Sequence, residues 1–183
     1  TYEDDTYYGQ DSVTITVLKK PALSDFTYTL PGDTVYDATA KEATVAVKGG
    51  ITGMGSYKIL YNGSEIAPVD AGTYTVTLQV AKSDTYAAAT FNLGTFTIAK
   101  ATPTITASDL TVTKNTTQAL SASISNGEAL TYQSSNPSIA AVDANGAVTG
   151  VAEGTAIITI YYSGSENYNT MTKNVTVTVT AKN

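Results

Sequence analysis

Apolar and polar residues alternate with a period of two along several stretches of the chain. The clearest stretches are residues 13–17, 74–80 and 175–179, in which Val, Ile or Leu alternates mainly with Thr. Because successive side chains of a strand point to opposite faces, this alternation predicts antiparallel strands with one buried and one solvated face. No stretch shows a sustained helical period. The pattern therefore predicts an all-β protein.

Turn residues separate the predicted strands. Asn62-Gly63 follows the strand-like residues 57–61, and Asn145-Gly146 joins residues 139–142 to residues 147–148. Asn and Gly tolerate the positive φ angles of tight hairpin turns, so both pairs predict hairpins. Gly150 and Gly154 bracket a further predicted turn, which precedes an apolar run.

A short internal repeat marks the ends of the predicted modules. Asp5-Thr6-Tyr7, Asp84-Thr85-Tyr86 and Glu166-Asn167-Tyr168 each precede a Thr-rich strand, and a short segment ending in Pro21 or Pro103 follows the first two. Proline cannot donate to a central ladder, which suits a link between modules. We predict that residues 1–20 are the last strand region of a preceding module, residues 21–99 one sandwich and residues 100–183 another. The linkers are short and not Gly-rich, which predicts limited bending.

Composition excludes several classes of function. The 183 residues include no Cys, His or Trp, and the ten basic residues are all lysines. Zinc sites, thiol nucleophiles and Ser-His-Asp triads all require a residue type that is absent. The net charge is −6 without a basic stripe, so we expect no nucleic-acid partner. No apolar run approaches the ~18 residues of a membrane span. We expect no enzyme, no cofactor and no metal.

The C-terminal half carries a long motif. Residues 132–160 read Tyr-Gln-Ser-Ser-Asn-Pro-Ser-Ile-Ala-Ala-Val at their start and Val-Thr-Gly-Val-Ala-Glu-Gly-Thr near their end. This stretch resembles the bacterial immunoglobulin-like group 2 domain, known from intimin- and invasin-type adhesins and other bacterial surface and secreted proteins. Tyr132 stands where that family usually has Trp, a conservative change in the core.

The middle of the chain is similar to a second bacterial immunoglobulin-like repeat, the MBG type. The matching residues are 35–41, 61–64, 67–76 and 96–100. Together the two resemblances imply tandem immunoglobulin-like antiparallel β-sandwiches. They also imply a structural stalk or spacer and adhesion-associated segment of a bacterial cell-surface or secreted protein, outside the cell. The expected partners are neighbouring immunoglobulin-like modules of the same chain.

Tyrosines suggest an alternative function. The chain has thirteen, and tyrosine combines an apolar ring with a polar tip, which suits recognition of a host or cell-surface protein or glycan. We expect Tyr161, Tyr162 and Tyr168, with Tyr2, Tyr7 and Tyr8, to be the most exposed, and take the first three as the candidate ligand-binding residues. Tyrosines of sandwiches also pack at sheet edges, and that interpretation stays open.

Other candidate sites have weaker support. Glu3-Asp4-Asp5, Asp70 and Asp143 could be calcium ligands but lack the alternate-position spacing of a calcium loop. Asp70 with Glu65 is the pair to inspect for a glycosidase. The Gly-rich residues 49–55 precede a strand and not a helix, which disfavours a phosphate loop. No arrangement of Lys, Asn and an acid indicates an isopeptide bond. We expect solvated acidic loops.

Overall fold

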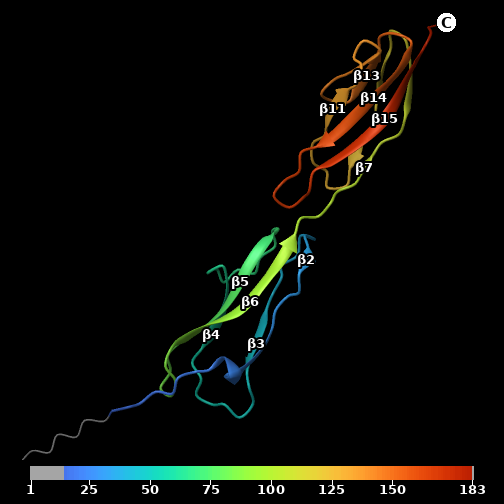
Figure 1. The fold of residues 1–183 in the computed structure, drawn as a ribbon. Helices are drawn as coiled ribbons and strands as arrows, with labels where there is room; N and C mark the ends of the chain where they lie inside the picture. The colour runs from blue at the N-terminus through green and yellow to red at the C-terminus, as the bar shows by residue number, and fades with distance from the viewer. Residues whose placement is uncertain (1–14, 183) are drawn as a thin grey trace, which may run out of the picture. The chain divides into compact units, whose positions relative to one another are not determined.

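The computed structural model describes residues 15–182, and their regular secondary structure is almost entirely β-strand, with loops and turns between the strands (Figure 1). Within that range the one helical element is a short 3-10 turn, η1 (Leu23–Asp25). No helix in that range is long and apolar enough to span a membrane. Contacts divide the described residues into two compact units, residues 15–30, 43–66 and 75–94, and residues 31–42, 67–74 and 95–182. The predicted all-β class is confirmed.

The first unit contains two facing layers of strands. β1 (Phe26–Thr29) pairs antiparallel with β3 (Thr44–Val47), and β4 (Tyr57–Tyr61) pairs antiparallel with β5 (Gly72–Val80). Phe26 packs edge-on against Tyr57 and lies against Phe91 of β6 (Ala89–Ala99). These ring contacts join the β1–β3 layer to the layer of β4 and β6.

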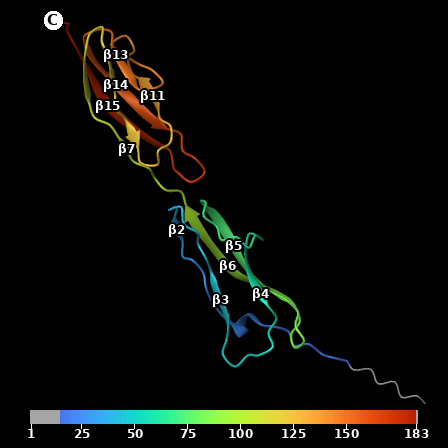
Figure 2. The ribbon, with the colours of Figure 1, turned by 180° about the vertical axis from the view of Figure 1, so that it is seen from behind.

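The second unit contains the C-terminal sandwich. Its larger sheet has the order β11-β14-β15-β8, of which Figure 1 labels β11, β14 and β15 from one side and Figure 2 from behind. The smaller sheets are β12-β13-β9 and β10-β7. The bounds are β7 (Ile105–Thr106), β8 (Leu110–Thr113), β9 (Thr117–Ala119), β10 (Ser123–Ile124), β11 (Thr131–Ser134), β12 (Ala140–Val142), β13 (Ala147–Gly150), β14 (Gly154–Tyr162) and β15 (Met171–Thr180).

The period-two pattern explains which side chains form the C-terminal core. Val175, Val177 and Val179 of β15 are buried, and the intervening threonines face outward. Ile158 and Ile160 of β14 are completely buried. Burying such a side chain stabilises the fold by about 1.5–3 kcal/mol. Burial of this stripe therefore fixes the register of the β14–β15 ladder, because a one-residue slip would expose all of it.

The two predicted Asn-Gly turns are present but differ in geometry. Asn62 and Gly63 both have positive φ, 48° and 89°, in a two-residue turn closed by hydrogen bonds between Tyr61 and Ser64. In the second turn Gly146 has φ 78°, and the Asp143 N–H donates to Ala147 O over 3.0 Å. That loop is longer than a two-residue hairpin, so a positive φ is needed at one position only.

Two features correct the sequence-based expectations. β2 (Thr34–Val35) pairs parallel with β6, and β8 pairs parallel with β15, so the sheets are not purely antiparallel. Of the strand predicted at residues 13–17, the first two residues lie outside the described range. Residues 15–17 form no strand, and Ile15 and Val17 are 80% and 86% exposed. A strand requires a hydrogen-bonded neighbour, and no described strand pairs with these residues. The module boundaries at 20/21 and 99/100 remain predictions.

Candidate functional site

Residues 100–102, here called the linker, follow β6 and precede the buried Pro103. They are held by residues 165–169, here called the clamp loop. The Ala101 N–H donates to Asn167 O over 2.9 Å, and the Asn169 N–H donates to Ala101 O over 2.8 Å. These two bonds form a parallel bridge between Ala101 and Tyr168. The linker is thus paired like a short strand and is not a free tether.

The clamp loop is itself rigidly built. The Ser165 N–H donates to Tyr168 O over 3.0 Å, which closes a tight turn. Gly164 precedes it with φ 79°, and a Cβ there would lie 3.0 Å from Tyr168 O. The Ser165 hydroxyl donates to Glu128 Oε1 over 3.2 Å, and the same carboxylate accepts the Tyr162 hydroxyl over 2.8 Å. The loop is therefore tied to the core of its sandwich.

Side chains of the clamp loop reach residues far away in sequence. The Asn167 amide is engaged at both atoms: Oδ1 accepts the Ala71 N–H over 2.7 Å, and Nδ2 donates to Asp70 Oδ1 over 2.9 Å. The Tyr168 ring packs edge-on against Tyr36, with ring centroids 5.4 Å apart. An edge-to-face pair of this kind contributes about 0.5–1.5 kcal/mol beyond the burial of its surface.

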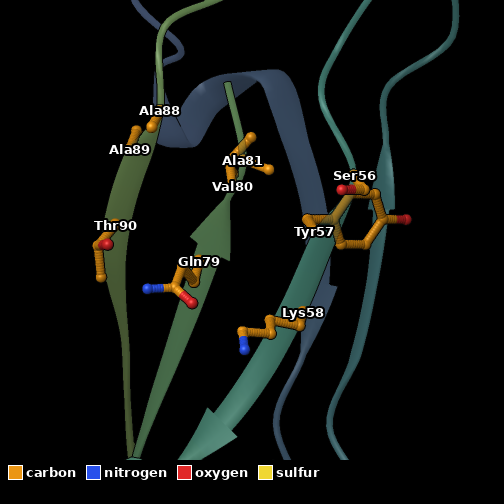
Figure 3. A pocket seen from close by; sticks show the side chains of 9 residues that line it. All are labelled: Ser56, Tyr57, Lys58, Gln79, Val80, Ala81, Ala88, Ala89 and Thr90. Atoms are coloured by element: carbon orange, nitrogen blue, oxygen red, sulfur yellow. The ribbon is translucent and has the colours of Figure 1, made fainter. Parts of the chain in front are cut away.

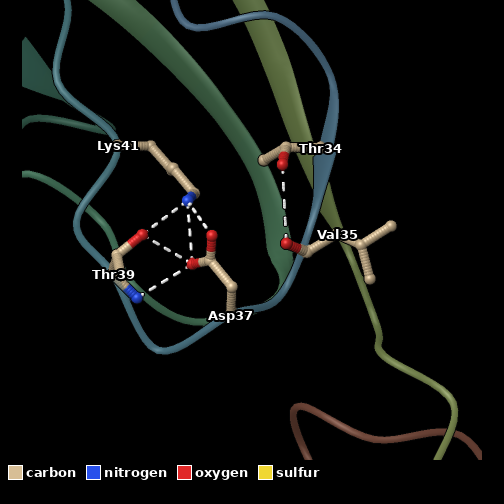
Figure 4. A network of polar contacts seen from close by, with 5 residues as sticks. All are labelled: Thr34, Val35, Asp37, Thr39 and Lys41. Atoms are coloured by element: carbon tan, nitrogen blue, oxygen red, sulfur yellow. Dashed lines mark hydrogen bonds and ion pairs between the residues drawn. The ribbon is translucent and has the colours of Figure 1, made fainter.

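The motif at residues 35–41 shapes the loop that presents Tyr36. Figure 4 shows the Asp37 carboxylate accepting bonds from the Thr39 N–H and hydroxyl and from Lys41 Nζ. The ammonium of Lys41, followed by the two bonds from Thr39, lowers the pKa of Asp37 to about 2. The backbone is anchored at both ends of the loop, because the Tyr36 N–H donates to Ala99 O and the Lys41 N–H donates to Pro68 O.

Tyr74 supports the turn at Asp70 and Ala71, to which the Asn167 side chain binds. Its hydroxyl donates to Asp70 O over 2.8 Å. Burial raises the pKa of Tyr74, and the negative charges of Asp70 and Glu166 raise it further. The hydroxyl therefore keeps its proton and its donor role across the physiological pH range.

A second clamp of the same design lies in the first unit. The Lys19 N–H donates to Thr85 O and the Ala87 N–H to Lys19 O, both over 2.8 Å, while the Ser83 N–H donates to Tyr86 O over 2.9 Å. We call residues 83–87 the first clamp loop. Residues 83–87 correspond one to one, without a gap, to residues 165–169 of the clamp loop. The copies of the repeat at residues 84–86 and 166–168 thus both lie in clamps, a role that their composition did not reveal, whereas Asp5-Thr6-Tyr7 lies outside the described residues.

The three predicted ligand-binding tyrosines do not form one surface. Tyr161 is 41% exposed and lies on the outer face of β14, opposite Thr131 and Thr172. The expectation that Tyr162 is exposed is wrong. Its side chain is 2% exposed, because it lies on the same buried face of β14 as Ile158 and Ile160. Tyr168 is half-buried against Tyr36. Tyr2, Tyr7 and Tyr8 lie outside the described residues.

The carboxylates considered for catalysis and for calcium have structural partners. Glu65 pairs with Lys58, and Asp70 is bound to Asn167. Asp143 accepts the Asn145 and Ala147 N–H groups, each over 2.8 Å. Within residues 15–182, no three Asp or Glu side chains gather as a metal site would require. Glu3-Asp4-Asp5 lies outside this range.

The Gly-rich residues 49–55 form a loop between β3 and β4, as expected. A Cβ on Gly55 would lie 1.9 Å from Ala81 O, so close backbone approach explains this glycine.

A pocket of about 610 Å³ lies at the start of β4, the end of β5 and the start of β6. Figure 3 shows its lining residues, with the polar side chains of Lys58, Gln79 and Thr90 at one end and three alanines at the other. The alanines are Ala81, Ala88 and Ala89. This volume falls within the range of about 300–1,000 Å³ that is common for small-molecule sites. No signal in the sequence pointed to it.

Family models match two parts of the chain. Residues 27–102 match the MBG domain, and residues 116–163 match the immunoglobulin-like domain of intimin. The predicted resemblance to bacterial immunoglobulin-like repeats is confirmed. None of the curated proteins matches the chain.

Several solved structures are similar in fold. Domains 4 and 5 of the S-layer protein SbsC are 20% identical, with a TM-score of 0.37, and the match covers 85% of this chain and 98% of that one. A 282-residue C-terminal fragment of intimin, solved with the intimin-binding domain of the translocated intimin receptor, is 19% identical, with a TM-score of 0.33 and coverage of 87% and 64%.

The Ig1-2 module of the Drosophila receptor tyrosine phosphatase DLAR is 12% identical, with a TM-score of 0.33 and coverage of 85% and 98%. The match to SbsC domains 4–9 covers 31% of that chain. The immunoglobulin-like fold class is confirmed by the family-model matches together with the all-β strand order.

Proposed function

We propose that this chain, which carries bacterial immunoglobulin-like repeats of the MBG and intimin types, is a structural spacer and adhesion-associated segment of a bacterial surface protein. One observation carries the proposal, namely that two sets of contacts, one of the main chain and one of side chains, hold the linker. Main-chain bonds fix Ala101, and the Asn167 and Tyr168 side chains bind residues that precede the linker. Bending at the linker would break these contacts together.

The chemistry of the clamp suits holding and not catalysis. Its contacts are backbone amides, one side-chain amide and two aromatic rings, and each contributes modestly, about 0.5–1.5 kcal/mol. Neighbouring immunoglobulin-like modules of the same polypeptide are the proposed partners, and the proposed location is outside the cell. The acidic surface, with a net charge of −6, opposes edge-to-edge association between copies.

The proposal is tested by measuring backbone order in the linker. NMR relaxation of the full chain should give Lys100, Ala101 and Thr102 order parameters near the ~0.85 of rigid backbone. The double variant Tyr36→Ala, Asn167→Ala should lower these values toward about 0.6 while β14 keeps its own. Tyr28→Ala, which removes an exposed ring on β1, is the matched control and should change nothing. A linker that is already mobile in the unaltered chain would refute the proposal.

A second candidate function, binding of a host or cell-surface protein or glycan, is favoured by the pocket beside Lys58 and Gln79. It offers an amide, a hydroxyl and the ammonium of Lys58, which is paired with Glu65, at one end and apolar alanines at the other, groups that suit a sugar. Glycan and matrix-protein arrays should be probed with the full chain, with Lys58→Ala plus Gln79→Ala, and with Tyr161→Ala. Saturable binding lost only in the first variant would assign recognition to the pocket.

A further inference from the structure

The end of β6 has a counterpart at the end of β15. β2 runs parallel to β6, and the Tyr36 N–H donates to Ala99 O over 2.8 Å. In the same way β8 runs parallel to β15, and the Lys114 N–H donates to Thr180 O over 2.8 Å. Lys114 therefore occupies in the C-terminal sandwich the position that Tyr36 occupies beside β6.

The turn bound by Asn167 also has a counterpart. Residues 69–72 read Val-Asp-Ala-Gly and residues 151–154 read Val-Ala-Glu-Gly, and each glycine begins the long strand that follows. By this alignment the Glu153 N–H corresponds to the Ala71 N–H that Asn167 accepts. Val151 is 42% exposed and Glu153 is exposed. Within residues 15–182, the side chains of Lys114 and Glu153 form no hydrogen bond or ion pair.

We infer that this end face, Lys114 with residues 151–153, is a docking surface for the clamp loop of another immunoglobulin-like repeat. The inference rests on the proposed spacer function and extends it from the linker inside the chain to a second surface. Its basis is that the chain already shows the same backbone arrangement, beside β6, occupied by such a loop. The occupant is thus a loop with the pattern Ser, acidic residue, Thr or Asn, Tyr, which both clamp loops share and whose third residue carries a side-chain oxygen.

The charge of Lys114 on the end face fits that loop. Lys114 replaces the Tyr36 ring, and an ammonium packs favourably over the face of a tyrosine. The chain contains such a contact beside the first clamp loop, where Lys19 Nζ lies 5.8 Å from the Tyr86 ring centroid. The acidic second residue of both loops, Asp84 or Glu166, adds attraction to Lys114. The Glu153 N–H would donate to the third residue, as the Ala71 N–H donates to Asn167.

The length of the sequence after β15 allows a direct test. Three residues follow Thr180, as three residues separate Ala99 from Pro103. The full chain extended after Asn183 by a second copy of residues 21–99 therefore keeps the linker spacing and supplies a copy of the first clamp loop. Hydrogen exchange at the Glu153 amide, followed by NMR, should slow at least tenfold relative to the unextended chain.

Matched variants make the outcome decisive. Lys114→Glu in the extended chain should restore most of the fast exchange, and Lys48→Glu, the same charge change at an exposed site, should not. Equal Glu153 exchange with and without the extension, in a chain whose added repeat gives native-like NMR dispersion, would overturn the inference. The Ala101 and Asn169 amides in the same spectra report the existing clamp, so failure of the proposed function would be seen separately, as fast exchange at those two positions.

Discussion

The side-chain amide of Asn167 donates to the carboxylate of Asp70 over 2.9 Å, although 97 positions separate the two residues. The same amide accepts the Ala71 N–H. Replacing Asn167 by Asp keeps the acceptor for Ala71 but sets two carboxylates against each other, whereas replacing it by Ala removes both bonds. The two substitutions therefore separate the contribution of the bond from the Ala71 N–H from that of the bond to Asp70.

We predict that Asn167→Ala speeds hydrogen exchange at the Ala71 amide at least fivefold and lowers the free energy of unfolding by no more than about 1 kcal/mol, because the bond to Ala71 is only part-buried and the bond to Asp70 is exposed. Asn167→Asp should give intermediate exchange at neutral pH. Ser125→Ala removes a comparable side-chain bond, to the Thr104 N–H, and serves as the control that leaves Ala71 unchanged. Unaltered Ala71 exchange in Asn167→Ala would contradict the contact.

Gly146 should be intolerant of a side chain for a reason beyond its φ. A Cβ there would lie 2.9 Å from the Tyr132 ring, whereas Gly127, with nearly the same φ of 72° against 78°, has open space around it. Both substitutions to Ala carry the cost of a left-handed backbone, about 1–2 kcal/mol. Gly146→Ala should cost at least about 1 kcal/mol more, because the ring must shift. Denaturant unfolding of both variants measures the difference. Equal losses of unfolding free energy would contradict the prediction and show that the Tyr132 ring moves aside at no measurable cost.

Much of the fold could be predicted because it follows from local pattern. The Val and Thr alternation of β15 gives its buried and exposed faces, and the Asn-Gly pairs mark turns. The same rule should have placed Tyr162 inside and Tyr161 outside, since Tyr162 has the parity of Ile158 and Ile160. The exposure of Tyr162 was predicted wrongly because the choice was guided by tyrosine content and not by the alternation of faces along the strand.

The clamp itself could not be predicted from the sequence. The repeat around Tyr86 and Tyr168 was visible, but its role depends on bonds between Ala101 and residues far along the chain. The alternation of apolar and polar residues and the types of turn residue carry no information on such pairings. The topology of the chain determines them. The parallel pairing of β2 with β6 and of β8 with β15 escaped prediction for the same reason.

The Asp37 network should be visible as a shifted titration. The pKa of Asp37 is lowered to about 2 by Lys41 and Thr39, so ionised Asp37 is favoured in the folded state. A folded pKa below the unfolded value means that the stabilisation is complete above about pH 4 and is lost as the pH falls from there through about 2. Lys41→Met should return the pKa of Asp37 toward 3.8 in an NMR titration. Lys48→Met is the control, and an unshifted Asp37 in the unaltered chain would contradict the network.

Tyr161 and Tyr162 are adjacent in β14, yet substitution should lower stability at Tyr162 and leave it nearly unchanged at Tyr161. Tyr162 is buried, and its hydroxyl donates to Glu128 Oε2, so Tyr162→Phe should lower the free energy of unfolding by about 1 kcal/mol. Tyr162→Ala should cost several times more, about 3–5 kcal/mol, because it leaves a cavity. Tyr161→Phe should change stability by less than about 0.5 kcal/mol, since its side chain lies on the solvated face.

Urea unfolding of the variants at Tyr161 and Tyr162, followed by tyrosine fluorescence and circular dichroism, provides the measurement. Because Glu128 also accepts the Ser165 hydroxyl, Tyr162→Phe should loosen the clamp loop as well, seen as faster exchange at the Asn169 amide. Tyr161→Phe should leave that amide unchanged. If both variants behaved alike, the inward position of Tyr162, and with it the link from the core through Glu128 to the clamp loop, would be wrong.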